Sequence, residues 1–361
     1  MKNILCIIDT LGIGGAERQM AGLAILLKKK GYTVDLVYYH KEDFYIPIVR
    51  KGGINPIYLS VENSQWSKFK AIRDYIKTHA KYDCVITYKG GPNAIGCLLK
   101  LYGMRFRLIV SERIANKNPS KYNKLVFWLY RFANYVVPNS YSQSEFLRSH
   151  YPWMKKKIVT ITNFTDTSYF TPSKKQTNEN IIILTAARIA KQKNIITYLD
   201  AITLLKERGI RNVHFEWYGD VQKGEEKYEE LVKENIAKQK ISDFISFHSN
   251  VYNIVEQYQR CSIFCLPSSF EGFPNVICEA MSCGKPIVCS RVCDNERIVS
   301  EEQNGLFFNP DDAKDIADKL ETMIKKNKEQ LEMWGRKSRE LALELLSEER
   351  FINKYITLIE Q

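Results

Sequence analysis

Two glutamates that lie close together in the chain are the residues best suited to chemistry. Glu271 precedes a Gly-Phe-Pro-Asn turn, and Glu279 falls in an apolar stretch. Pro274 suits a first helical turn and Gly284 suits a helix stop, so we predict a helix over about 275–283. Because a helix N-terminus favours phosphate, the two carboxylates could hold two parts of one polar ligand there.

Two cations in an earlier loop suit an anionic ligand. Arg188 and Lys193 bracket the loop between an expected strand, 181–185, and an expected helix, 195–208. An arginine fork and a lysine point charge at fixed positions can neutralise a diphosphate. Without a further observation, Arg188 and Lys193 would be interpreted as two solvated cations in a loop. The acidic segment 271–279 in the same half of the chain favours a shared site.

A glycine-rich turn follows the first expected strand, 4–8. It lacks the third glycine of a dinucleotide fingerprint, since Glu17 takes that place, and no acidic residue clearly ends the second strand. A nicotinamide cofactor is therefore not expected. Gly14 and Gly15 would let backbone approach a ligand closely, or they would only form a tight strand-to-helix turn. Both interpretations stay open, and Glu17 would serve the helix dipole.

The elements that must position these residues follow an alternating pattern. Apolar runs alternate with amphipathic stretches in both halves of the chain, which predicts two doubly wound parallel sheets of the α/β class. The polar segment 171–180 contains Pro172 and has no periodicity, so it is the best linker candidate. The expected strands are 4–8, 34–38, 84–87, 108–110, 135–137, 181–185, 213–218, 244–247, 263–266 and 287–289.

Charge is distributed unevenly along the 361 residues. Residues 1–165 contain 26 Lys and Arg against 10 Asp and Glu, whereas residues 166–361 contain 27 against 31. The basic first half indicates an anionic partner. No apolar run reaches membrane-spanning length, and the N-terminus does not have the pattern of a signal peptide. The nine scattered cysteines predict buried thiols in a reducing cytosol rather than disulfides or a metal site.

A basic and aromatic segment, 117–131, is the main candidate for contact with that partner. As a helix it would lie on an anionic membrane surface, with cations at the head groups and aromatic rings dipping inward. The alternative is a solvated face with a buried stripe. Nucleic acid is not expected, because no reading motif is present. The membrane candidates are Lys121, Lys124, Phe127, Trp128 and Arg131.

Taken in order, these motifs resemble the family-4 nucleotide-sugar glycosyltransferases of the GT-B fold. The matching residues are Gly14-Gly15-Ala16-Glu17-Arg18, Arg188 with Lys193, Glu271 to Asn275 with Glu279, and Gly284-Lys285-Pro286. The resemblance implies two Rossmann-like domains that face a central cleft. Residues 1–170 would form the acceptor-side domain, 171–180 the linker and 181–340 the donor-binding domain, with 341–361 packing back on the first domain.

The resemblance also implies a role for each residue. Arg188 and Lys193 would bind the donor diphosphate and stabilise the charge that grows as the sugar leaves. Glu279 would bind the ribose and Glu271 the donor sugar. Retention of configuration would follow from a front-face reaction without an enzyme nucleophile. No Asp-x-Asp motif is present, so neither a divalent metal nor a further cofactor is expected. Other implied donor contacts are Gly14, Gly15, Gly272, Phe273, Pro274 and Asn275.

One departure from the family pattern bears on the substrate. Many members carry a histidine where this chain has Ser111-Glu112-Arg113. Glu112 or Arg113 would contact the donor sugar; Glu112 is taken as the implied donor contact, and the separate roles of the three residues stay open. The variant is similar to members that extend lipid-linked bacterial glycans, often with N-acetylhexosamine donors.

The resemblance therefore implies a function and a location. The chain would transfer a hexose or N-acetylhexosamine from a UDP donor to a lipid-linked or oligosaccharide acceptor of a surface glycan, such as capsule, O-antigen or lipopolysaccharide. It would be cytoplasmic and peripheral on the inner face of the cell membrane. The alternatives are a non-catalytic nucleotide-sugar-binding scaffold and a nucleotide-sugar epimerase.

Overall fold

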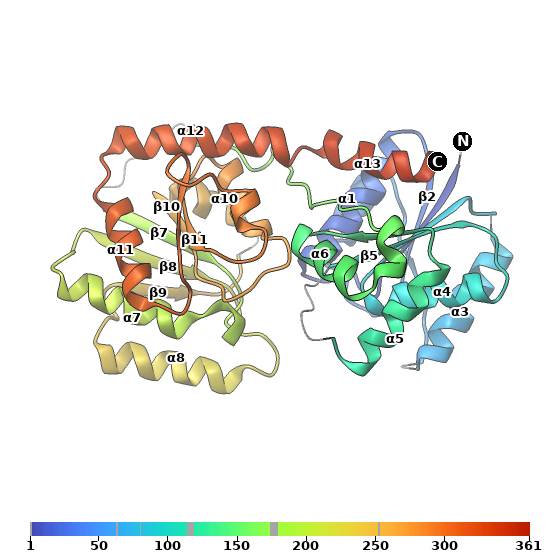
Figure 1. The fold of residues 1–361 in the computed structure, drawn as a ribbon, viewed down its shortest axis with the longest axis horizontal. Coiled ribbons are helices and arrows are strands. Elements are labelled where there is room, and N and C mark those ends of the chain that lie inside the picture. The colour runs from blue at the N-terminus through green and yellow to red at the C-terminus, as the bar shows by residue number, and fades with distance from the viewer. Residues whose placement is uncertain (1, 63, 80, 114–118, 174–179, 252) are drawn as a thin grey trace. The chain divides into compact units, whose positions relative to one another are not determined.

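The chain forms two units, each built on one parallel sheet (Figure 1). The first unit comprises Met1–Phe164 and Glu348–Gln361, and the second comprises Thr165–Ser347. The computed structural model describes all residues except 1, 63, 80, 114–118, 174–179 and 252. The prediction of two Rossmann-like units, each with a doubly wound sheet, is confirmed.

The first unit has six parallel strands in the order β3-β2-β1-β4-β5-β6. One face of the sheet packs on α1, α2 and α13, and the other packs on α3, α4, α5 and α6. Its strands are β1 Asn3–Ile7, β2 Thr33–Tyr38, β3 Ile57–Tyr58, β4 Cys84–Tyr88, β5 Arg107–Glu112 and β6 Tyr135–Pro138. Its helices are α1 Gly15–Lys29, α2 Ile46–Lys51, α3 Gln65–Thr78, α4 Gly90–Leu101, α5 Lys121–Leu129, α6 Tyr141–His150 and α13 Glu348–Glu360, with short 3₁₀ turns at Tyr130–Phe132 and Pro152–Lys157.

The second unit repeats the scheme with the order β12-β11-β10-β7-β8-β9. Helices α7, α8 and α11 cover one face, and α9 and α10 cover the other. Its strands are β7 Ile181–Ala186, β8 Val213–Tyr218, β9 Ile245–His248, β10 Ile263–Leu266, β11 Ile287–Ser290 and β12 Gly305–Phe308. Its helices are α7 Ile195–Glu207, α8 Glu226–Gln239, α9 Ile254–Arg260, α10 Asn275–Ser282, α11 Ala313–Ile324 and α12 Lys328–Leu345.

The strand orders define one switch point in each sheet. In the first unit the direction of winding reverses between β1 and β4, and in the second it reverses between β7 and β10. At a switch point the loops after the two central strands diverge, which leaves a crevice at the carboxyl ends where such folds bind ligands. A ligand is therefore expected at the loops after β7 and β10 or at those after β1 and β4.

The boundary between the units lies earlier than residue 170. Phe170 is buried in the core of the second unit, with its ring 6.0 Å from that of Tyr258. Arg339 also donates to the carbonyl oxygens of Thr167 and Phe170, each at 2.9 Å. These contacts assign residues 165–170 to the second unit. Of the predicted linker, residues 174–179 lie outside the described residues.

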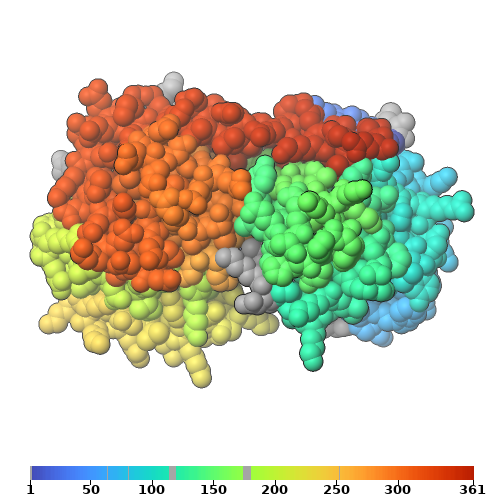
Figure 2. Space-filling model, viewed as in Figure 1, coloured from blue at the N-terminus to red at the C-terminus, as the bar shows by residue number. Residues whose placement is uncertain are grey.

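The segment 341–361 does not pack as one piece on the first unit. Ala342 and Leu346 are buried in the core of the second unit, as a continuation of α12. Only Glu348–Gln361 belongs to the first unit, where α13 lies on the outer surface (red in Figure 2). There Tyr355 is fully buried, and its hydroxyl is 2.9 Å from that of Tyr88.

Candidate functional site

An ion pair spans the switch point of the second unit. Lys193 ends a 3₁₀ turn, Lys191–Lys193, in the loop after β7, and Glu271 lies in the loop after β10. Lys193 Nζ is 2.5 Å from Glu271 Oε1, and the two side chains are only 13% and 11% exposed. The structure thus brings together a predicted cation and a predicted carboxylate that are far apart in sequence.

The two loops that carry this pair are tied to each other. Gln192 donates from its side-chain Nε2 to the carbonyl oxygen of Phe270 at 2.8 Å. In return, Ser269 donates its backbone N–H to the backbone carbonyl oxygen of Gln192 at 2.9 Å. Asn194 ends the turn in the left-handed conformation, with φ 57°, which asparagine tolerates better than most residues. The sequence did not single out Gln192, although it lies next to Lys193.

Arg188 lies at the same edge of the sheet, but its side chain is not paired with a described residue. Its side chain is exposed and makes no hydrogen bond or ion pair with any residue that the structure describes. The backbone beneath it is fixed, because Ile189 donates to the Asp220 oxygen at 3.0 Å. Gly219 must be glycine, since a Cβ there would overlap the Ala187 carbonyl. The guanidinium is therefore available to an anion on a rigid base.

Glu279 lies inside α10, as predicted from the sequence. The residue is 4% exposed, and its Oε2 accepts a hydrogen bond from the Tyr258 hydroxyl at 2.9 Å. The expected helix 275–283 is observed as Asn275–Ser282. Tyr258, on α9, was not singled out from the sequence, because nothing in its local pattern shows which helix it faces.

The turn before α10 offers backbone donors at the start of this helix. Neither Gly272 nor Phe273 donates its N–H to another group in the described part of the chain. Glu271 donates its own N–H to Cys293 Sγ at 3.4 Å, and Cys293 has a left-handed φ of 51°. Unpaired N–H groups at the start of a helix bind phosphate well, so Gly272 and Phe273 of the predicted segment have the required chemistry. Pro274 has no N–H, and Asn275 donates its own to the Phe273 oxygen at 3.0 Å.

The glycine turn of the first unit has a partner that the sequence did not reveal. Lys89, directly after β4, contacts Glu17 and lies 2.9 Å from Asp9 Oδ1. Burial lowers the pKa of Lys89, but the two carboxylates outweigh it and leave the pKa raised. Glu17 therefore does more than serve the helix dipole. Gly15 is the first residue of α1, and Gly14 lies just before it.

Glu112 is enclosed within the first unit. Its carboxylate accepts hydrogen bonds from the Tyr130 hydroxyl and, at 3.3 Å, from Asn93 Nδ2. Burial raises the pKa of Glu112, against the opposing effect of these two donors and of Arg113. A sugar could reach this carboxylate only by displacing or joining its present partners, so its role as a donor contact stays a prediction.

Arg113 and Ser111 have structural partners. Arg113 donates to Asn163 Oδ1 at 2.8 Å and to the Tyr355 hydroxyl at 2.9 Å. Its guanidinium also lies 3.5 Å from the centre of the Tyr88 ring. Ser111 donates its hydroxyl to the Val137 oxygen at 2.5 Å. Arg113 therefore connects α13 to the carboxyl ends of the central strands β4 and β5.

Four of the five candidates for membrane contact are exposed, and one is buried. Phe127 was predicted wrongly: it is 1% exposed and packs against the rings of Tyr130 and Tyr151. The other four, Lys121, Lys124, Trp128 and Arg131, are exposed. The structure adds the exposed Leu125 on the same helix and Trp153 on the Pro152–Lys157 turn. The guanidinium of Arg131 lies 4.1 Å from the Trp128 ring centre and 5.6 Å from that of Trp153.

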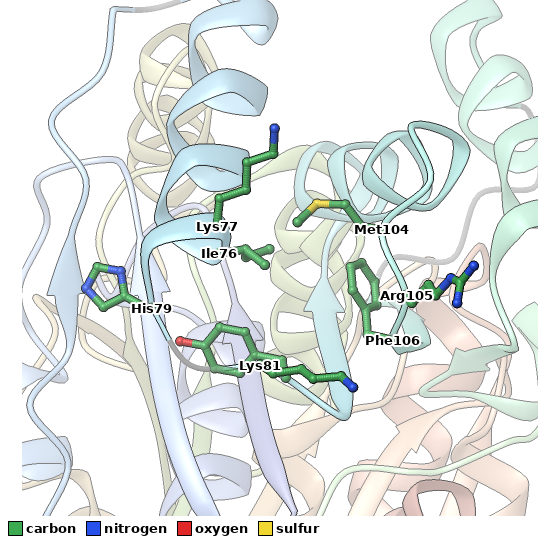
Figure 3. A pocket seen from close by; sticks show the side chains of 8 residues that line it. Ile76, Lys77, His79, Lys81, Met104, Arg105 and Phe106 are labelled. Atoms are coloured by element: carbon green, nitrogen blue, oxygen red, sulfur yellow. The ribbon is translucent and has the colours of Figure 1, made fainter.

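A hollow at the opposite edge of the first sheet carries no chemistry that we can assign (Figure 3). It lies beside the residues that precede β4 and β5, not at the carboxyl ends of the strands. Its centre is apolar, with Ile76, Met104 and Phe106, and Figure 3 shows Lys77 and Arg105 pointing to different sides. The basic side chains therefore do not converge on one anion.

Among the residues that the structure describes, no helix is both long and apolar enough to cross a membrane. No group of three or more His, Cys, Asp or Glu side chains among those residues could hold a metal ion.

Comparison with known proteins identifies the class. Residues 13–169 match the family described as Glycosyltransferase Family 4, and residues 168–341 match Glycosyl transferases group 1. Together with two Rossmann-like sheets and a charged site at a switch point, these matches define a GT-B glycosyltransferase. The chain belongs to this class and resembles the bacterial polysaccharide transferases within it.

Individual relatives cover almost the whole chain. An N-acetylgalactosaminyltransferase of Campylobacter jejuni, named for a diphospho-undecaprenol-linked acceptor, is 27% identical over 340 residues, which is 90% of this chain and 89% of the relative. The amylovoran biosynthesis glycosyltransferase AmsD of Erwinia amylovora is 26% identical over 85% of this chain and 88% of its own. The structure of Anabaena HepE with UDP and glucose superposes with a TM-score of 0.88 at 17% identity, over all of both chains.

Proposed function

We propose that this glycosyltransferase moves an N-acetylhexosamine, of the N-acetylgalactosamine type, from UDP to a glycan linked to undecaprenyl diphosphate. The observation that carries the donor class is the Lys193–Glu271 pair across the β7/β10 switch point, with the exposed Arg188 and the buried Glu279 at the same edge. The names of the Campylobacter jejuni relatives support the sugar and the acceptor.

The reaction would proceed with retention of configuration. The bond between the anomeric carbon and the β-phosphate oxygen breaks, and the acceptor hydroxyl bonds to that carbon from the same face. The hydroxyl proton passes to the departing phosphate oxygen. Arg188 and Lys193 stabilise the charge that grows on the diphosphate, and fixed cations of this kind usually supply the largest catalytic effect. Glu271 would then accept hydrogen bonds from the sugar rather than act as a nucleophile.

The test is a transfer assay with the full chain. UDP-N-acetylgalactosamine, UDP-N-acetylglucosamine, UDP-galactose and UDP-glucose would each be incubated with polyprenyl-diphosphate-linked acceptors. We expect transfer with an N-acetylhexosamine donor and an α-linked product by NMR. Binding without transfer across the panel would favour the scaffold, and conversion of the donor without acceptor would favour the epimerase. A β-linked product would contradict retention.

We also expect transfer to be independent of divalent metal. Arg188 and Lys193 would supply the positive charge that a metal supplies elsewhere, and Lys193 is held in place by Glu271. The rate should therefore be unchanged after treatment with EDTA and dialysis. Loss of activity that Mg²⁺ or Mn²⁺ restores would contradict this expectation.

We propose further that the first unit associates with anionic membranes. Its surface patch consists of Lys121, Lys124, Leu125, Trp128, Arg131 and Trp153, all exposed. Between Asp83 and Asp166 the sequence has only two acidic residues, Glu112 and Glu145, and Glu112 is buried. Half-exposed tryptophans with cations around them suit the interface of a bilayer with anionic head groups.

Vesicle sedimentation tests the patch. The double variant Trp128→Ser with Trp153→Ser should lower binding to phosphatidylglycerol vesicles by roughly 10-fold or more, because both interfacial anchors are lost. The matched control is Trp66→Ser, since Trp66 is 60% exposed in the same unit but lies outside the patch. Binding should also weaken with salt. Equal binding to neutral and anionic vesicles would remove the electrostatic argument.

A further inference from the structure

Three charged side chains meet at the switch point of the first unit. Asp9 follows β1, Lys89 follows β4, and Glu17 lies in the first turns of α1. Lys89 Nζ contacts both carboxylates, and the side chains of Asp9, Lys89 and Glu17 are 27%, 23% and 7% exposed. This cluster occupies the place in the first sheet that the Lys193–Glu271 pair occupies in the second.

The base of the cluster is held firmly. The Asp9 carbonyl accepts from the backbone N–H groups of Tyr39 and His40, at 3.2 and 2.8 Å. Asp9 Oδ1 also accepts from the N–H of Thr10 at 2.9 Å. Lys89 has a φ of 74°, a conformation that non-glycine residues adopt rarely and mostly where the surroundings enforce it. The direction of the Lys89 side chain is therefore set by Asp9, which follows β1, and by Glu17 on α1.

Glu17 is the neighbour that a side chain at position 14 would meet. Gly14 has a φ of 177°, which is extended backbone that any residue can adopt. A Cβ at this position would nevertheless overlap Glu17 Oε2, because the Glu17 side chain lies against the turn. Lys89 holds Glu17 there. The conformation of the turn is thus linked, through Glu17, to a lysine that follows β4.

We propose that Lys89 is a positioning residue for the transfer reaction. By holding Glu17 against Gly14, it keeps the turn of residues 12–15 in one conformation. The inference rests on the proposed function and on the donor contacts that the family resemblance implies for Gly14 and Gly15. Lys89 itself touches no reacting atom and acts through Glu17.

The first arm of the test measures kcat, the KM of each substrate and the affinity for UDP. Lys89→Met should lower kcat by roughly 10²-fold, as a misplaced positioning group does. The affinity for UDP should fall much less than kcat, because the cations proposed to bind its diphosphate lie in the second unit. Lys89→Arg should retain most of the activity. The matched control is Lys70→Met, an exposed lysine on α3. An unchanged kcat in folded Lys89→Met would overturn the proposal.

A second variant guards against misfolding. Lys89→Met leaves the buried Glu17 carboxylate without its cation, which is destabilising. The double variant Lys89→Met with Glu17→Gln removes that charge, so its thermal stability should return towards wild type while kcat stays low. Recovery of kcat together with stability would show that Lys89 is only structural.

The last arm is a cycle between Gly14→Ala and Glu17→Ala. If Gly14 is needed only because Glu17 lies against it, the double variant will be no slower than Glu17→Ala alone. If instead the losses of kcat in the two single variants multiply in the double variant, the methyl group added by Gly14→Ala blocks a ligand directly. That result would overturn the proposal.

Hydrogen exchange provides a readout without substrate. Amides of residues 12–15 should exchange faster in Lys89→Met than in wild type, and unchanged exchange would overturn the positioning role. A wild-type chain that transfers no sugar would contradict the proposed function, while the exchange experiment would still decide whether Lys89 orders the turn.

Discussion

Replacing Lys193 with alanine is expected to lower kcat by roughly 10²- to 10³-fold, the usual loss when one preorganised group that stabilises developing charge is removed. The ammonium lies at the β7/β10 switch point, where the diphosphate would accumulate charge as the sugar departs. Its loss also leaves the Glu271 carboxylate, now without its ion-pair partner, facing an anionic donor. The measurement is steady-state transfer with UDP-N-acetylgalactosamine, with circular dichroism to check the fold.

Two further variants separate the causes. Lys193→Arg keeps the charge but not the compact ammonium, and should lie between wild type and Lys193→Ala. Lys193→Ala with Glu271→Gln removes the unpaired carboxylate. If repulsion by Glu271 were the main cause, this double variant would recover most of kcat. If stabilisation of the leaving diphosphate is the main cause, it stays slow. Near-normal turnover in folded Lys193→Ala would remove the proposed catalytic role.

A proline before α10 and a glycine after it explain why the sequence predicted this helix so well. Pro274 and Gly284 fixed the expected helix at about 275–283, and the structure has Asn275–Ser282. Local signals of this kind depend on backbone geometry alone. The two-residue strand β3, Ile57–Tyr58, was missed because it is too short for any periodicity. Strand β12, Gly305–Phe308, was not among the expected strands either, although it completes the second sheet.

Side-chain partners across the sheet could not be predicted in the same way. Lys89 and Asp9 are 80 positions apart and meet only because β1 and β4 are neighbours. Each follows a strand, so the switch-point rule would have suggested the pair once the strand order was known. Phe127 and Trp128 show the same limit on a helix. They are adjacent, and only tertiary packing decides that the first is buried and the second exposed.

Removing the Glu279 carboxylate is the other change with a large expected effect. Glu279→Ala should weaken UDP binding by roughly 10²-fold, since hydrogen bonds to charged groups contribute about 1.5–3 kcal/mol each. The affinity should be lost while the fold persists, because α10 keeps its apolar contacts through Ile277, Ala280 and Met281. Isothermal titration with UDP measures the effect, and kcat at saturating donor should change less than KM.

A modified ligand shows whether the contact is to the ribose. Wild type should bind UDP much more tightly than 2′,3′-dideoxy-UDP, whereas Glu279→Ala should bind the two alike, because the group that reads the hydroxyls is gone. Tyr258→Phe is the matched control: it removes the hydroxyl that donates to Glu279 Oε2 but keeps the carboxylate. It should therefore still discriminate between the two nucleotides. Undiminished discrimination in Glu279→Ala would place the ribose elsewhere, and Glu279 would then act only through its bond with Tyr258.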